Sequence, residues 1–180
     1  NGRQDLRHHI SHLQLVDLED HPRFSELDVA ANFQSLWAFP DDYIMKINLP
    51  VVGLARVQAM YPIGSLQRAG ARIVGGSDWP VSSMNPLLAI ETAVTRRDPS
   101  GLTPDALNEA EAMTLADMIE AYTANGAYLA HREDETGRLM PGYKADLVVL
   151  GANLFTLAPS EIGEVPIVMT FFEGKKVYPK

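Results

Sequence analysis

The sequence contains no cysteine, so disulfide bonds and thiolate metal sites are both excluded. It also has no apolar run near the roughly 18 residues that a membrane-spanning helix needs. Basic residues are outnumbered, with 15 Lys and Arg against 23 Asp and Glu, which gives a net charge of −8. Such a chain has no basic surface to attract phosphates. We therefore expect neither a nucleic-acid partner nor a membrane.

A recognisable leader segment is lacking too, and the sequence begins with Asn1 instead of methionine. The true N-terminus is then outside this sequence, but the absence of cysteine and of a visible signal favours the cytoplasm. The composition itself is typical of a globular protein, since 46% of the 180 residues are hydrophobic. That length suffices for one domain with a sizeable core, or for one and a half small domains.

The segment 71–80 predicts a short buried strand that runs into a turn. Two β-branched residues are followed by Gly75 and Gly76, which let the backbone approach another group closely or adopt positive φ. Asp78 comes just past the strand end, where an α/β barrel places its chemistry. Alternatively, Asp78 caps the turn or helix around residues 82–86.

Predicted strands and helices alternate through the first part of the chain. We expect strands over 6–13, 29–34 and 71–74, with helices over 17–27 and 51–67 between them. This order favours parallel strands joined by crossover helices. Further helices are expected over 86–94, 104–112 and 115–131, the first and last of them capped by Asn85 and Thr114.

After residue 132 the pattern changes to short extended pieces separated by glycine and proline. Strands are expected over 138–140, 146–150, 168–172 and 176–178, with a tight turn at Glu173-Gly174. These pieces predict an antiparallel sheet separate from the first one. The sequence thus predicts two units, 1–135 and 136–180.

Histidines near the start of the chain are candidate metal ligands. On a strand, His8 and His12 share a face but lie about 13 Å apart, too far to bind one metal. On a helix they have the spacing of the zinc-protease motif, but His9 occupies the position of its general-base Glu, so that interpretation fails. His12 is nearer the strand end, and a metal role for it needs partners. In isolation, each histidine, including His21, is interpreted as a solvated or hydrogen-bonded residue.

Four motifs occur in an order and spacing that resemble the amidohydrolase superfamily. They are Ile10-Ser11-His12-Leu13-Gln14, Gly75-Gly76-Ser77-Asp78-Trp79-Pro80-Val81, Ala121-Tyr122-Thr123-Ala124-Asn125-Gly126-Ala127, and the segment from Pro141 to Leu150. The resemblance is to amidohydrolase family 3, the branch of the YtcJ-like proteins and N-substituted formamide deformylase. It covers nearly the whole chain.

This resemblance implies a (β/α)8 barrel that carries one or two divalent metals, usually zinc, beside a small β-sandwich made from both chain ends. His12 matches the metal ligand that ends the sixth barrel strand. Asp78 matches the Asp that ends the eighth strand, binds the metal and takes the proton of the attacking water. The chain then corresponds to barrel strands six to eight, and residues 141–150 match the strand that re-enters the sandwich.

The chain departs from the family pattern in several ways. Ser11 stands where this branch usually has Glu, and Ser35 follows Gln34 where the branch usually has Pro. The His-x-His of the first strand and the ligands of the fourth and fifth strands have no match. A complete barrel needs about 250 residues, so the chain resembles a C-terminal fragment, which can lack the metal because two ligands do not close a zinc site.

The resemblance therefore implies a hydrolase that cuts a non-peptide C–N bond in a small amide or formamide. Gln34, Trp37 and Trp79 are candidate pocket residues, with Phe39 in the same aromatic cluster. An alternative of another class is a non-catalytic module that forms a homo-oligomer through exposed barrel edges. Stoichiometric zinc would favour the hydrolase, and a metal-free oligomer would favour the module. A phosphoesterase on the same barrel is a third, less favoured alternative.

Overall fold

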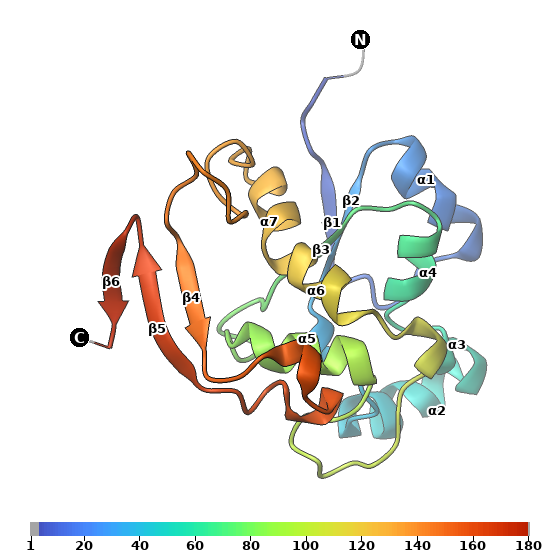
Figure 1. Ribbon diagram of the computed structural model, residues 1–180. Helices are drawn as coiled ribbons and strands as arrows, with labels where there is room; N and C mark the ends of the chain where they lie inside the picture. The colour runs from blue at the N-terminus through green and yellow to red at the C-terminus, as the bar shows by residue number, and fades with distance from the viewer. Residues whose placement is uncertain (1–3, 180) are drawn as a thin grey trace.

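Two three-stranded sheets, one parallel and one antiparallel, organise the chain in the computed structural model, which describes residues 4–179 (Figure 1). The strands are β1 (His9–Ser11), β2 (Ala30–Phe33), β3 (Ile73–Gly75), β4 (Leu147–Leu150), β5 (Ile167–Phe172) and β6 (Lys175–Tyr178). The α-helices are α1 (His21–Glu26), α2 (Leu49–Val52), α3 (Leu54–Gln58), α4 (Ile63–Arg68), α5 (Pro86–Thr95), α6 (Leu115–Tyr122) and α7 (Ala124–Leu129). A π-helix over Tyr43–Asn48 precedes α2.

The parallel sheet has the order β1-β2-β3, as the alternation of strands and helices predicts. Ser11 is aligned with Asn32, and Asn32 with Val74. The central strand β2 is the most buried, with Ala31 and Phe33 fully enclosed. Because all three strands run in one direction, their carboxyl ends meet at one edge of the sheet.

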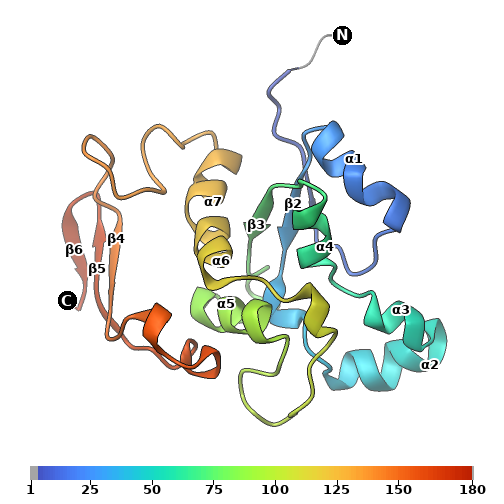
Figure 2. The same ribbon diagram turned by 45° about the vertical axis from the view of Figure 1, so that its right-hand side comes forward.

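Figure 2 shows α1 and α4 on the right of the parallel strands and α6 and α7 on the left. Side chains from these helices complete the hydrophobic core, in which Ile63, Leu66 and Met118 are fully buried. The apolar face of α6, with Met118 and Ala121 buried, thus faces the core. Within residues 4–179 no helix is both long enough and apolar enough to cross a membrane.

The antiparallel sheet has the order β4-β5-β6 and lies beyond α6 and α7 in both views (Figures 1 and 2). Glu173 and Gly174 join β5 to β6 with φ of 48° and 76°, as expected for a tight hairpin turn. The connection between β4 and β5 is held to α5, because the Gly163 N–H donates to Glu91 Oε2 at 2.7 Å. Burial raises the pKa of Glu91. The unit boundary between residues 135 and 136 stays a prediction.

Local capping was predicted correctly at two helices. The Asn85 side chain accepts a hydrogen bond from the Leu87 N–H at the start of α5. Thr114 does the same for the Asp117 N–H at the start of α6. Both caps depend on residues within three positions of each other, so the sequence alone carries the information.

Other predicted elements differ from the structure. The helix expected over 115–131 is interrupted at Thr123, whose φ and ψ are −124° and −88°. The helix expected over 104–112 is reduced to a single turn of 3₁₀-helix over Glu109–Glu111. Residues 138–140 form no strand. His21, which was interpreted as solvated, is buried.

A fully buried arginine explains the loss of the helix over 104–112. Arg96 donates from Nε to the Leu107 carbonyl at 2.8 Å, and from Nη1 and Nη2 to the carbonyls of Tyr61 and Met60 at 3.2 and 3.0 Å. Burial lowers the pKa of Arg96 to about 10, so the group remains protonated near neutral pH. Because Arg96 occupies the Leu107 carbonyl, that carbonyl is not available for a helical hydrogen bond. The 104–108 segment is joined instead to the loop before α4.

The segment before β1 is tied to α7 by Arg7. Its guanidinium donates to Glu133 Oε2 at 2.7 Å, also contacts the Tyr128 carbonyl, and lies 4.1 Å from the centroid of the Tyr128 ring. Arg72 lies 3.8 Å from the same ring centroid. Hydrogen bonds from Arg7 lower the pKa of Glu133 to about 2. The two ends of the parallel unit are therefore in direct contact.

Candidate metal centre

The two predicted metal ligands follow the two outer strands of the parallel sheet. His12 comes immediately after β1, and Asp78 comes three residues after β3. Both therefore lie at the carboxyl edge of the sheet. Their strand ends are not adjacent, because β2 lies between β1 and β3, which agrees with the match of His12 to the sixth barrel strand and of Asp78 to the eighth.

His12 lies at the centre of an unusual turn. Its φ is 73°, and the Leu13 N–H donates to the Ser11 carbonyl at 3.0 Å. A hydrogen bond from residue i+2 to residue i around a positive φ describes the rarer and more strained form of the γ-turn. The imidazole is exposed and stacks on the Trp37 ring, with centroids 5.2 Å apart and planes inclined by 15°. No residue within 4–179 hydrogen-bonds to its ring nitrogens, which leaves them available for a metal.

Asp78 also has left-handed backbone geometry, with φ of 53°. Its carbonyl accepts a hydrogen bond from the Val81 N–H at 2.8 Å, which closes the turn. Its carboxylate is exposed and has no hydrogen-bond or ion-pair partner in the described part of the chain. The alternative that Asp78 caps the following turn or helix is wrong, because its carboxylate accepts no hydrogen bond within residues 4–179 and Asn85 caps α5. The carboxylate is free for chemistry.

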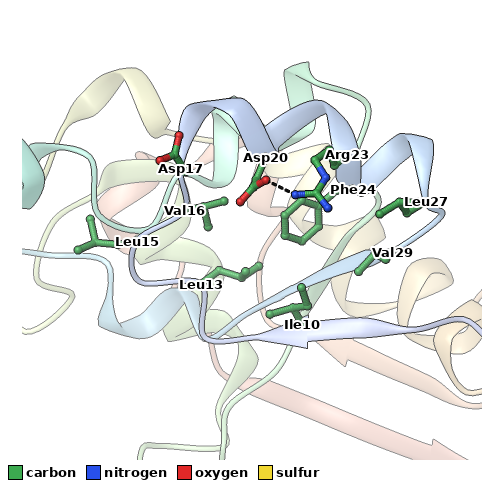
Figure 3. A pocket seen from close by; sticks show the side chains of 10 residues that line it. All are labelled: Ile10, Leu13, Leu15, Val16, Asp17, Asp20, Arg23, Phe24, Leu27 and Val29. Carbon is green, nitrogen blue, oxygen red and sulfur yellow. Dashed lines mark hydrogen bonds and ion pairs between the residues drawn. The ribbon is translucent and has the colours of Figure 1, made fainter.

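The predicted pocket residues have different environments. Gln34 is buried, and both polar atoms of its side chain are engaged within the protein. Trp37 is half-buried against His12, whereas Trp79 is 64% exposed. An open, mainly apolar pocket of about 340 Å³ lies elsewhere, between β1 and α1, and contains none of these three residues (Figure 3). Their role in binding substrate stays a prediction.

Gly75 and Gly76 allow close contacts, and neither has positive φ. A Cβ on Gly75 would lie 2.3 Å from Cε2 of the Tyr122 ring. A Cβ on Gly76 would lie 3.0 Å from Asn32 Oδ1 and 3.1 Å from Gln34 Nε2. Of the two explanations for this pair, close approach is therefore the correct one.

We expect Gly75→Ala to lower the free energy of unfolding by about 1–3 kcal/mol, because the added methyl group overlaps the Tyr122 ring. Urea unfolding of the purified chain measures this change. Gly126→Ala is the matched control, since its nearest neighbouring heavy atom would be 3.9 Å away and the position is helical. Equal stability of the two variants would contradict the proposed overlap.

The sequence interpretation missed Asn32 as a member of this site. Its Oδ1 accepts a hydrogen bond from Gln34 Nε2 at 3.2 Å, and its carbonyl accepts one from the His12 N–H at 3.1 Å. A signal was present, because Asn32 and Gln34 are two polar residues on one face of an otherwise apolar strand. Such alternation at the end of a central strand indicates polar groups directed toward a site.

An imidazole and a carboxylate are ligands that zinc accepts in proteins. Because the His12 ring nitrogens and the Asp78 carboxylate have no hydrogen-bond partner within residues 4–179, these two residues at one sheet edge fit a divalent metal as part of its ligand set. Residues 4–179 contain no cluster of three or more His, Asp or Glu side chains arranged to hold a metal. Because catalytic zinc sites use three protein ligands, a zinc site at His12 and Asp78 would need further ligands.

Comparison with known proteins identifies the family. The profile described as "Amidohydrolase family" matches residues 1–178. A Bacillus subtilis protein described as "Putative amidohydrolase YtcJ" is 29% identical over all of this chain and 33% of its own length. The N-substituted formamide deformylase of Arthrobacter pascens is 32% identical over 64% of this chain and 21% of its own length.

Solved structures agree with this result. An uncharacterized metal-dependent hydrolase from Pyrococcus horikoshii superposes with a TM-score of 0.71 and 25% identity, over 88% of this chain and 31% of that one. The chain thus spans about a third or less of the length of these similar proteins. The resemblance carried by the four motifs is confirmed, and the chain belongs to the amidohydrolase family.

Proposed function

We propose that this chain is part of a metal-dependent hydrolase that cuts a non-peptide C–N bond. The observation that carries the proposal is the placement of His12 and Asp78 at the carboxyl edge of a parallel sheet in an amidohydrolase-family chain, with no hydrogen bond to their ring nitrogens or carboxylate within residues 4–179. In this proposal the parallel unit forms strands six to eight of a (β/α)8 barrel. Residues 1–135 belong to that barrel, and residues 136–180 to a composite β-sandwich.

A divalent metal held there, with zinc the expected ion, would acidify a water molecule and polarise the scissile carbonyl. His12 contributes a neutral ring nitrogen as a ligand, and the stacked Trp37 ring restricts how its imidazole turns. Asp78 contributes a carboxylate oxygen. The same carboxylate accepts the proton of the attacking water and passes it to the leaving nitrogen, so that the amine departs neutral.

The proposed substrate is a small amide or formamide. Support comes from the name of the Arthrobacter pascens relative, an N-substituted formamide deformylase. The aromatic side chains of Trp37 and Trp79 add apolar surface near His12 and Asp78, which suits an apolar N-substituent.

We expect the 180-residue chain by itself to show weak zinc binding and no measurable turnover, because its described residues bring no group of three ligands together. The test incubates the chain with zinc and a panel of N-acyl and N-formyl amines. A longer form of the protein that contains this chain and further ligands is assayed in parallel and should be active. Metal-dependent turnover by the 180-residue chain would contradict the need for further ligands, and an inactive longer form with bound zinc would contradict the proposed hydrolase.

A second candidate is a non-catalytic module that self-associates. It is favoured by the outer side of β1, which has no strand partner among residues 4–179, and by the 50% and 45% exposure of Ile10 on this strand and Leu15 in the loop after it (Figure 3). Light scattering after size exclusion and zinc analysis of the same sample distinguish the candidates. An oligomer that stays metal-free in added zinc would favour the module, whereas a monomer, whether it keeps zinc or loses this weakly bound metal on elution, would favour the hydrolase.

A further inference from the structure

The buried amide of Gln34 contacts the backbone of the proposed metal ligand. Gln34 Oε1 accepts a hydrogen bond from the His12 N–H at 2.9 Å. The same N–H also donates to the Asn32 carbonyl at 3.1 Å, the contact that continues the pairing of β1 with β2. Gln34 thus supplies a second acceptor at the residue where the chain leaves the sheet.

That residue has a conformation that requires support. His12 and Leu13 have consecutive positive φ angles of 73° and 49°, which cost free energy in residues other than glycine. Such a conformation persists only where surrounding contacts determine it. The hydrogen bond that the His12 N–H donates to Gln34 Oε1 fixes the centre of this turn, and the stacked Trp37 ring holds the His12 side chain.

The amide of Gln34 also connects the loop that carries His12 with the loop that carries Asp78. Its Nε2 donates to Asn32 Oδ1 at 3.2 Å, and the backbone of Gly76 lies against both of these atoms. Gly76 is two residues before Asp78, and its N–H donates to the Phe33 carbonyl at 3.0 Å. The Asn32–Gln34 amide pair at the end of the central strand therefore lies between the loop of His12 and the loop of Asp78.

We propose that Gln34 is a positioning residue, which fixes the turn of His12 and, through Asn32, sets its separation from Asp78. This inference rests on the proposed function, because it takes His12 and Asp78 as metal ligands. It replaces a substrate-binding role for Gln34, since the side chain is only 4% exposed and both of its polar atoms are already hydrogen-bonded. Groups that orient metal ligands in this way change metal affinity without touching the metal.

The experiment measures binding of zinc alone to the 180-residue chain by NMR, following the His12 and Asp78 resonances up to millimolar metal. Gln34→Leu removes both hydrogen bonds and should raise the apparent Kd by about tenfold or more. Gln34→Glu keeps an acceptor for the His12 N–H, and Asn32 can turn its amide to donate to the new carboxylate. It should therefore retain most of the wild-type affinity.

Asn125→Leu is the matched control. This partly buried amide also accepts and donates, contacting Arg72 and the Ile73 carbonyl, but it packs beside β3 and away from the His12 turn. We expect it to lower stability in urea without changing the zinc Kd. A Kd that followed stability alone across these variants would assign Gln34 a purely structural role and overturn the inference.

The remaining outcomes separate this inference from the proposed function. Zinc that shifts the His12 resonances with the same Kd in wild type and Gln34→Leu would overturn the positioning role and leave His12 as a ligand. Zinc that leaves the His12 resonances of the wild-type chain unchanged would overturn both. His12→Ala confirms the assignment if it removes the zinc response at Asp78.

Discussion

Replacing Asp78 by asparagine, in a form of the protein that holds the complete metal site, should lower kcat/KM by at least about 100-fold, the lower range for removal of a general base. Asparagine keeps the size of the side chain and tolerates the positive φ at this position. It cannot take a proton from the attacking water. The loss should therefore appear mainly in kcat, with the fold and the unfolding midpoint unchanged.

Asp28→Asn is the matched control for this experiment. Asp28 is also exposed and has φ of 55°, but it precedes β2 and so lies at the opposite edge of the sheet. Its substitution should leave kcat/KM unchanged. Full activity in Asp78→Asn, or an equal loss in both variants, would contradict the assignment of Asp78 as proton acceptor.

The largest effect on stability is expected at Arg96. Arg96→Met should lower the free energy of unfolding by about 2–4 kcal/mol, because the buried carbonyls of Met60, Tyr61 and Leu107 would lose their donors. Burial of the Arg96 charge costs free energy, as the lowered pKa of this group indicates. Removal of the charge in Arg96→Met therefore offsets part of the loss. Urea unfolding of the 180-residue chain gives the value.

The neighbouring Arg97 provides a direct comparison. It is partly exposed and forms an ion pair with Glu109 at 2.7 Å, an arrangement that contributes little at a protein surface. Arg97→Met should change stability by less than about 1 kcal/mol. If Arg96→Met unfolds at the same urea concentration as Arg97→Met, the three carbonyl contacts do not stabilise the loop.

The fold was predictable where the relevant forces are local or periodic. Alternating strands and helices identified the parallel sheet, and side-chain caps marked the starts of α5 and α6. The interruption at Thr123 was not predictable in this way. It follows from tertiary contacts, since Tyr122 packs on Gly75 and Asn125 donates to the Ile73 carbonyl at 3.0 Å.

At the candidate site, too, sequence motifs predicted some features, whereas others depend on tertiary contacts. The positions of His12 and Asp78 came from motifs whose order resembles a known family, but sequence patterns do not reveal a strained turn at a histidine. The role of Gln34 depends on a hydrogen bond to a residue 22 positions away, on a neighbouring strand. Without the register of β1 against β2, a polar residue beside an aromatic cluster is naturally interpreted as a pocket wall.

The contact between Arg7 and α7 has a consequence for how the parallel unit loses structure. In a linear array of strand–helix units, the terminal units have neighbours on one side only and fray first. Here Arg7, in the segment before β1, donates a hydrogen bond to Glu133, which lies just beyond α7. Its guanidinium also lies over the ring of Tyr128, which is part of α7. The first and last elements of the parallel unit thus contact each other directly. Neither end can fray without breaking this contact, so we expect β1 and α7 to open together.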